Sequence, residues 1–178
     1  MVLLGCTPPG RLTEQHDIFF GVAENLSDLV PAMKASWPEA MGNVHIDAWR
    51  EVTSVEGHSV RVIARTTLPP GEKRLFFVNL GGYKKEEFEE FHYKMPVVAA
   101  NKGEAVQSSR QTAFYKHAGF KGAASHIDDL YGVDADEVHE VAEILAPEFK
   151  QEFSIQIIQR VELSEDPIHL GYLRLHKI

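Results

Sequence analysis

The sequence contains very little cysteine and no long hydrophobic run. Cys6 is the only cysteine among 178 residues, so no intramolecular disulfide can form. Free thiols are typical of reducing compartments, and we therefore expect a cytoplasmic protein. No apolar stretch approaches the roughly 18 residues that a membrane-spanning helix needs, so we expect no membrane partner.

Basic residues are also scarce. The chain has 18 Lys and Arg against 26 Asp and Glu, which gives a net charge of -8 at pH 7. Binding to nucleic acid depends on clustered basic residues, so we expect no nucleic-acid partner. The motifs Gly-x-Ser-x-Gly, His-Glu-x-x-His and paired Cys-x-x-Cys are missing too, which removes the commoner hydrolase and zinc templates.

What the sequence does contain is a block of residues that occurs twice. Eight matching positions are separated by 76 residues: Val2, Leu4, Gly5, Glu14, His16, Val22, Ala23 and Asn25 match Val78, Leu80, Gly81, Glu90, His92, Val98, Ala99 and Asn101. A His-Ile-Asp triplet also occurs twice, at 45–47 and 126–128, where the separation has grown to 81 residues. Ordered matches of this kind indicate tandem copies of one structural unit.

We therefore predict an α/β protein of the α+β type, built from two tandem β-β-α-β repeats. The repeats would be related by a pseudo-twofold axis and share one core, because each half is small for an independent core. The first unit would cover residues 1–68 and the second 72–146. Residues 147–178 would add C-terminal strands that complete the fold, and one single domain overall is the alternative division.

Local patterns predict the elements of the first half. We expect strands over 2–5, 16–24, 45–52 and 59–64. The apolar run after His16 predicts a strand that is buried on both faces. Asn25, with Asp28 at the third helical position, is typical of a helix N-terminus, and Pro38 should end that helix.

The second half is predicted in the same way. We expect strands over 75–80, 93–99, 153–161 and 168–175, an extended segment over 126–133, and helices over 101–119 and 135–146. Pro96 cannot donate to a strand ladder, so its strand should lie at an edge or a bulge. Gly81 and Gly82 favour a tight turn, residues 84–91 a short helical turn, and Pro147 the end of the last helix.

The duplicated residues carry a resemblance to a known family. A Leu-Gly step, a Glu-x-His pair, an apolar strand, a helix and a His-x-Asp pair, all present twice, resemble the bacterial family catalogued as domain of unknown function 1543. The resemblance covers roughly residues 2–55 and 76–145, as expected of a two-copy member. That family has no established activity, so the resemblance supports the architecture and implies no mechanism.

Four pairs of residues are candidates for a site. Each pair joins a histidine and a carboxylate two residues apart, which in an extended chain places both on one face about 7 Å apart. The pairs are Glu14 with His16, His45 with Asp47, Glu90 with His92, and His126 with Asp128. If neighbouring strands bring two pairs together, each half gathers two histidines and two carboxylates.

Three interpretations of these pairs remain open. We favour a structural one, in which the polar groups satisfy each other and join one strand to the next. The second is binding of a ligand or substrate, with a histidine and a carboxylate as a general base. The third is a divalent metal such as Zn²⁺, with His16, His45, His92 and His126 as candidate ligands.

Function is less well defined by the sequence than architecture. We favour a non-enzymatic module that binds a small molecule or a protein, or that assembles through exposed sheet edges, with a homodimer left open. No cofactor is predicted under that view. The alternative is a small enzyme or metalloprotein that uses the duplicated pairs, and the two differ in whether the purified protein carries a metal.

Overall fold

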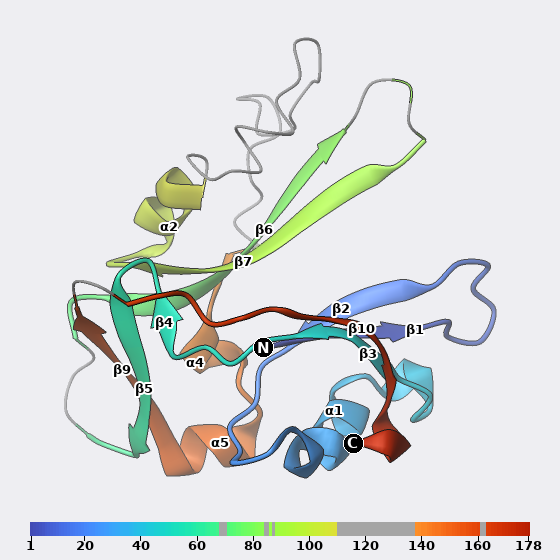
Figure 1. Cartoon of the computed structure of the whole chain (residues 1–178), viewed down its shortest axis with the longest axis horizontal. Helices are drawn as coiled ribbons and strands as arrows, with labels where there is room; N and C mark the ends of the chain where they lie inside the picture. The colour runs from blue at the N-terminus through green and yellow to red at the C-terminus, as the bar shows by residue number, and fades with distance from the viewer. Residues whose placement is uncertain (68–70, 84–85, 87, 110–137, 161–162) are drawn as a thin grey trace.

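The computed structural model describes residues 1–178 apart from 68–70, 84–85, 87, 110–137 and 161–162. It has an α+β fold with three antiparallel sheets and short helices (Figure 1). The strands are β1 (Val2–Cys6), β2 (Gln15–Phe19), β3 (His45–Trp49), β4 (Ser54–Val55), β5 (His58–Ala64), β6 (Arg74–Tyr83), β7 (Glu90–Ala99), β8 (Val138–Glu140), β9 (Phe153–Gln159) and β10 (His169–Arg174). The helices are η1 (Leu26–Leu29), α1 (Val30–Ser36), η2 (Pro38–Ala40), α2 (Lys102–Ser109), α4 (Val141–Ile144), α5 (Pro147–Glu152) and η4 (Leu175–Lys177), where η denotes a 3-10 helix.

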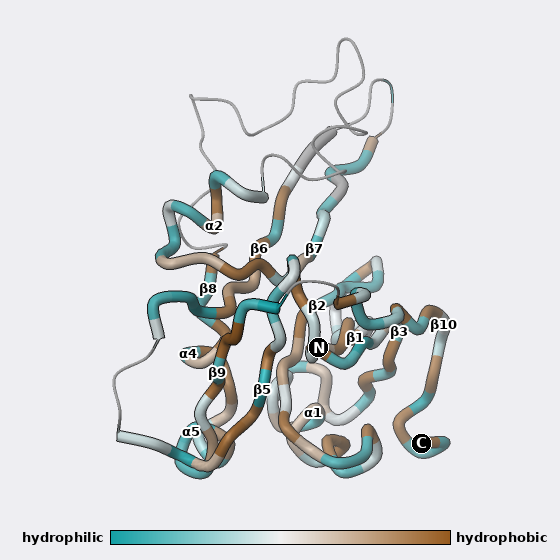
Figure 2. The backbone as a smooth tube through the Cα atoms, turned by 60° about the vertical axis from the view of Figure 1, so that its left-hand side comes forward, coloured by the Kyte–Doolittle hydropathy of each residue, from teal (hydrophilic) through white to brown (hydrophobic). Residues whose placement is uncertain are grey.

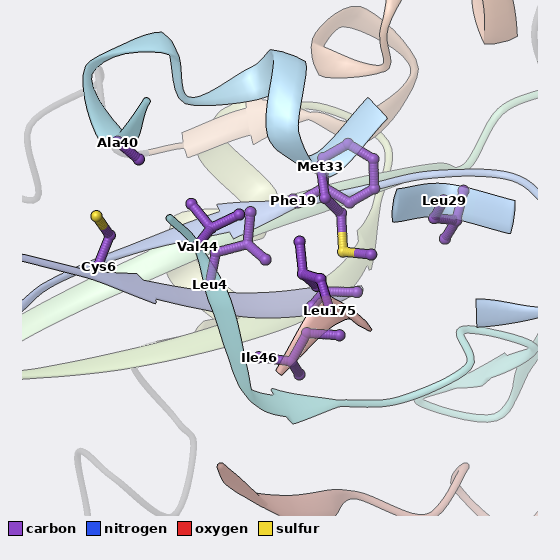
Figure 3. Packing of buried hydrophobic residues seen from close by; sticks show 10 residues of the cluster. Leu4, Cys6, Phe19, Leu29, Met33, Ala40, Val44, Ile46 and Leu175 are labelled. Carbon is purple, nitrogen blue, oxygen red and sulfur yellow. The ribbon is translucent and has the colours of Figure 1, made fainter. Parts of the chain in front are cut away.

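The first sheet has the strand order β10-β3-β1-β2. Leu4 of β1 and Ile46 of β3 are fully buried against Met33 of α1, and Figure 3 shows these side chains converging on one another. Side chains alternate along a strand, so Leu3 and Gly5 lie on the opposite face. We call that face, which is turned away from α1, the distal face of the first sheet.

The helix that covers this sheet begins where the sequence predicts. Asp28 Oδ2 accepts hydrogen bonds from the backbone N–H and from the side-chain amide of Asn25, both at 3.1 Å. Such reciprocal contacts satisfy donors that a helix N-terminus leaves unpaired. The first turn is the 3-10 helix η1, and α1 continues from Val30 to Ser36 with Pro31 in its first turn.

The second sheet has the order β4-β5-β9. β4 and β5 form a hairpin whose turn residues Glu56 and Gly57 both have positive φ, 48° and 72°. Two successive residues of positive φ are typical of the tight turns that match strand twist. β9 then pairs with all of β5, from His58 opposite Gln159 to Ala64 opposite Phe153, and Figure 2 shows its hydrophobic stretches beside that strand.

The third sheet has the order β7-β6-β8. β7 is an edge strand, as Pro96 predicts, and Pro96 stands opposite Phe77 of β6. The helix α2 covers one face, where Phe76, Val78 and Ala105 are buried together. Glu104 N donates to Asn101 Oδ1 at 3.0 Å, which confirms that this helix begins just after Asn101.

A shared core joins the three sheets. Its buried members come from β2's C-terminal end, the second sheet, the β6–β7 hairpin and α4: Phe20, Val55, Val60, Leu75, Phe77, Val98, Val141 and Leu145. Phe20 and Phe77 meet edge to face with ring centroids 5.9 Å apart. The C-terminal segment contributes strands to two sheets, since β9 pairs with β5 and β10 pairs with β3.

The two long hairpins pair in the same register. Gly5 faces His16 in the β1–β2 hairpin, and Gly81 faces His92 in the β6–β7 hairpin. All five residue pairs of β1 with β2 have counterparts 76 residues later in the pairing of β6 with β7. The third strand differs, because Val2 faces Trp49 in the first sheet while its counterpart Val78 faces Val138.

Several predicted elements are wrong. Residues 135–146 were expected to form one helix, but Val138–Glu140 is strand β8, and only Val141–Ile144 is helical. Hydrogen bonding to β6 provides β8 with partners that the helical spacing could not foresee. Pro147 does not end a helix but occupies the first position of α5, where a missing N–H costs little.

The regions around the predicted turns also differ. Gly81 and Gly82 lie within β6, which runs on to Tyr83, so they form no turn. The helical turn expected over 84–91 is replaced at its end by β7, which begins at Glu90. β2 stops at Phe19, and its first residues are exposed rather than buried on both faces. The predicted joint at 69–71 and the helix beyond Ser109 lie largely outside the described residues.

Candidate functional site

Residues that the sequence offers as two separate pairs meet on the distal face of the first sheet. Gly5 of β1 stands opposite His16 of β2 on one side and His45 of β3 on the other. Directly opposed residues of neighbouring strands share a face, so the two histidines flank Gly5. Glu14, two residues before His16, extends towards the same place.

Asp47 reaches this place through a β-bulge. The pairing of β1 with β3 shifts register between Leu3, which faces Ala48, and Leu4, which faces Ile46. Asp47 is therefore the extra residue of β3, and a bulge of this kind redirects the side chain that it inserts. The strand order and the bulge together bring four polar side chains to one point.

Four short distances define the arrangement, which we call the His-carboxylate cluster (Glu14, His16, His45 and Asp47). His16 Nε2 lies 3.1 Å from Asp47 Oδ2 and 3.6 Å from Glu14 Oε2. His45 Nε2 lies 3.1 Å from Glu14 Oε1 and 3.3 Å from Asp47 Oδ1. Each histidine thus contacts both carboxylates through the same ring nitrogen.

The cluster is buried on one side and open on the other. The side chain of His45 is 10% exposed, whereas that of Glu14 is 44% exposed. His45 Nε2 and Asp47 Oδ2 are both buried, and within the described part of the chain neither has a hydrogen-bond partner. Buried polar atoms are rarely left in this state, so the closeness of these groups is not explained by hydrogen bonds between them.

Gly5 explains how the cluster fits against the sheet. A Cβ at this position would clash with Asp47 Oδ2 and with His45 Nε2. Only glycine leaves the space that these two side chains occupy. The Leu-Gly step of the sequence motif is thus tied to the same site as the two histidine pairs.

A residue that the sequence analysis did not select also contacts the cluster. The ring of Tyr172 on β10 lies 4.4 Å from the ring of His45, measured between centroids, at an interplanar angle of 41°. β10 is irregular here, because Gly171 has a φ of 130° and the register shifts between Leu170 and Leu173. Gly171 was the available signal, but nothing in the sequence relates it to His45.

The second hairpin carries only part of a comparable arrangement among the described residues. His92 Nε2 lies 3.7 Å from Glu90 Oε2, and His92 Nδ1 is 3.0 Å from Asn79 Nδ2. A Cβ at Gly81 would lie 2.8 Å from Glu90 Oε1, so this glycine also faces its Glu-x-His pair. His126 and Asp128, the other predicted members, lie outside the described residues.

Cys6 takes no part in the cluster. Its side chain points into the core beneath the sheet, as Figure 3 shows, and the residue is 1% exposed. Burial raises the pKa of the Cys6 thiol, and the nearby charge of Glu14 raises it further. A buried thiol of raised pKa is a poor nucleophile, in agreement with its interpretation as a small residue in a strand.

The fold and the first copy of the motif correspond to known proteins. The fold resembles the crystal structure of a protein Il1583 from Idiomarina loihiensis, with a TM-score of 0.62 and 23% sequence identity over 98% of this chain and 94% of that one. Residues 11–62 match the family model described as Domain of Unknown Function (DUF1543), and over this segment the chain belongs to that family. The matched segment contains the whole His-carboxylate cluster, and the proposed second copy stays a prediction.

Two further comparisons bear on the site. No protein with a curated description matches the chain. Among the described residues, no helix is both long enough and apolar enough to cross a membrane.

Proposed function

We propose that this protein binds a divalent cation, with Glu14, His45 and Asp47 as its ligands. One observation carries the proposal: the buried Nε2 of His45 stands between two carboxylates, yet it has no hydrogen-bond partner in the described chain. A cation accounts for this geometry because it lets the ring nitrogen and both carboxylates point at a shared centre instead of at each other. Each of the three residues offers one ligand atom, and these atoms lie within 4.8 Å of one another.

The spacing agrees with metal coordination. Ligands placed tetrahedrally at 2.0–2.2 Å from a zinc ion are about 3.4 Å apart. The two contacts of His45 with the carboxylates measure 3.1 and 3.3 Å. One imidazole and two carboxylates suit Zn²⁺, Mn²⁺ or Fe²⁺, and three protein ligands leave a coordination position open.

His16 is assigned a supporting role. Its Nε2 is 3.1 Å from Asp47 Oδ2, the carboxylate oxygen that is not near His45. A histidine that holds the second oxygen of a ligating carboxylate fixes the direction of the first oxygen. His16 would in this way orient Asp47, and it stands close to the open position.

Elemental analysis of the purified protein tests the proposal. The wild-type protein should carry close to one equivalent of cation per chain, and His45→Ala should lose it because the buried ligand atom is gone. His176→Ala is the matched control, since His176 is an exposed histidine on η4, away from the cluster's strands. A cation that binds His45→Ala as well as wild type would contradict the assignment.

Thermal unfolding separates the proposal from the structural interpretation. If the cluster only joins β2 to β3, adding and removing cations should leave the melting temperature unchanged. A bound cation at 100 times its Kd stabilises the native state by about 2.7 kcal/mol. For a chain of this size that corresponds to a rise of roughly 5–10 °C, which differential scanning calorimetry measures directly.

We also infer that the two hairpins are copies of one ancestral unit related by a pseudo-twofold axis. The support is the shared register, in which the pairing of β1 with β2 recurs 76 residues later in β6 and β7. Gly5 and Gly81 each face a Glu-x-His pair. In solution, cation binding by Glu90→Gln would be unaffected if the second hairpin carries no site of its own.

A further inference from the structure

A cleft lies beside the His-carboxylate cluster on the same face of the sheet. Its floor includes Leu3 of β1, Ile18 of β2 and Ala48 of β3. These residues stand opposite one another in the ladder, with Leu3 facing both Ile18 and Ala48. They form the row next to Gly5, His16 and His45, one two-residue step of about 7 Å away.

The opposite wall comes from the other half of the molecule. Met95 and Pro96 of β7 line the cleft together with Ile168, which precedes β10. The volume is about 400 Å³, within the range typical of small-molecule sites. The floor residues and Met95 are each half-buried, so they offer apolar surface to an occupant.

Arg50 lies at the far end of this cleft. It follows Ala48 by two residues, and its side chain is only 10% exposed. Its Nη2 is buried without a hydrogen-bond partner in the described chain, although Glu165 and Asp166 oxygens lie 3.7 and 4.0 Å away. These carboxylates already balance the charge of Arg50, so Nη2 suits a neutral acceptor such as a hydroxyl or a carbonyl.

We propose that the cleft binds the apolar body of a small organic acid whose carboxylate completes the coordination of the cation. The inference rests on the proposed function, because it assigns the open position of that site. The acid is a chain with a neutral oxygen at its far end, which accepts a hydrogen bond from Arg50. From the row of Gly5 to that of Arg50 is about 13 Å along the sheet, which suits a body of about six to eight carbons.

Binding of ω-hydroxyoctanoate and of acetate to the cation-loaded protein tests this inference. Both share the carboxylate, but only the longer acid can occupy the cleft. Isothermal titration calorimetry should show at least about tenfold tighter binding of ω-hydroxyoctanoate, because burial of several methylene groups adds to the contact of the head group. Removal of the cation should weaken the binding of both acids.

Two variants make the test specific. Ala48→Leu should fill the middle of the cleft and reduce ω-hydroxyoctanoate binding to the level of acetate, while the cation content stays at the wild-type value. Ala64→Leu makes the same change at the exposed end of β5 and should leave both affinities unchanged.

The outcomes distinguish the two proposals. If elemental analysis finds no cation, the proposed function fails and this inference falls with it. Where the cation is present, the inference alone is overturned by any of three results: equal affinity for the two acids, full affinity in Ala48→Leu, or ω-hydroxyoctanoate binding that does not depend on the cation.

Discussion

Gly5 shows how one residue without a side chain makes room for a group of charged ones. It lies between the strands that carry the two histidines, and the space above it is filled by Asp47 and His45. The cluster could not lie this close to the sheet over any other residue. A substitution at Gly5 should therefore affect the site without touching any of the four polar side chains.

Gly5→Ala tests this directly. The added Cβ would clash with His45 Nε2 and Asp47 Oδ2, and overpacking of this kind typically costs about 1–3 kcal/mol. We expect a corresponding loss in the free energy of unfolding, measured by urea denaturation, together with weaker cation binding. Gly81→Ala is the control, since its Cβ meets only the end of the flexible, exposed Glu90 side chain. Equal losses in both variants would contradict the role assigned to Gly5.

At the scale of elements, one carboxylate holds the segment before β10 to the loop between β3 and β4. Asp166 accepts hydrogen bonds from the N–H of Thr53 at 2.6 Å, from Thr53 Oγ1 at 2.6 Å and from the N–H of Ser54 at 2.9 Å. Burial acts to raise the pKa of Asp166, but these hydrogen bonds and the charge of Arg50 outweigh it and lower that pKa. The segment that leads into β10 is thereby fixed next to the first sheet.

Asp166→Asn should destabilise the protein in a pH-dependent way. A lowered pKa in the folded state contributes stability above the pKa of the unfolded chain, about 3.9, and this contribution is lost as the pH falls through the folded value. At pH 7 we expect a loss of about 1.5–3 kcal/mol, the usual value for hydrogen bonds to a charged group. Urea denaturation of both proteins should show the difference shrinking as the pH falls below 4.

Glu165→Gln serves as the control for this prediction. Its side chain is 63% exposed and lies 3.7 Å from Arg50, and exposed ion pairs contribute little. The free energy of unfolding of this variant should stay close to the wild-type value at every pH. A loss as large as that of Asp166→Asn would mean that overall charge near Arg50, rather than the hydrogen bonds of Asp166, holds the segment.

At the scale of the whole molecule, the shared core decides whether the halves are independent. Phe77 of the second half is buried against Phe20 of the first, and Val60 and Val141 belong to the same cluster. Strands β9 and β10 from the C-terminal segment also pair with strands of the first half. The three parts of the chain therefore contribute to one another's folding.

Phe77→Ala should destabilise the entire protein rather than one hairpin. Truncation of a buried phenylalanine costs about 3–5 kcal/mol, and we expect one cooperative transition at lower temperature by both near-UV and far-UV circular dichroism. Phe88→Ala is the matched control, because Phe88 is fully exposed and its loss should change stability by less than about 0.5 kcal/mol. Two separate transitions in Phe77→Ala would show that the halves unfold independently.

Local features of the fold were predictable because their causes are local. Asn25 with Asp28 marks the start of a helix through contacts three residues apart, and Pro96 marks an edge strand through its missing N–H. The 138–140 segment was mispredicted as helix because its hydrogen-bond partners belong to β6, about 60 residues earlier in the chain. Gly81 and Gly82, expected in a turn, are held in a strand by β7 in the same way.

The sequence by itself determined the α+β class, the pairs Glu14 with His16 and His45 with Asp47, and the resemblance that the match over residues 11–62 confirms. These follow from composition and from spacings of a few residues, which need no knowledge of distant contacts. Only the tertiary structure decided that the two pairs meet, because that depends on β1 lying between β2 and β3 and on the bulge at Asp47. The contact of Tyr172 with His45 likewise depends on the strand order, which places β10 beside β3 from more than 100 residues away in the sequence.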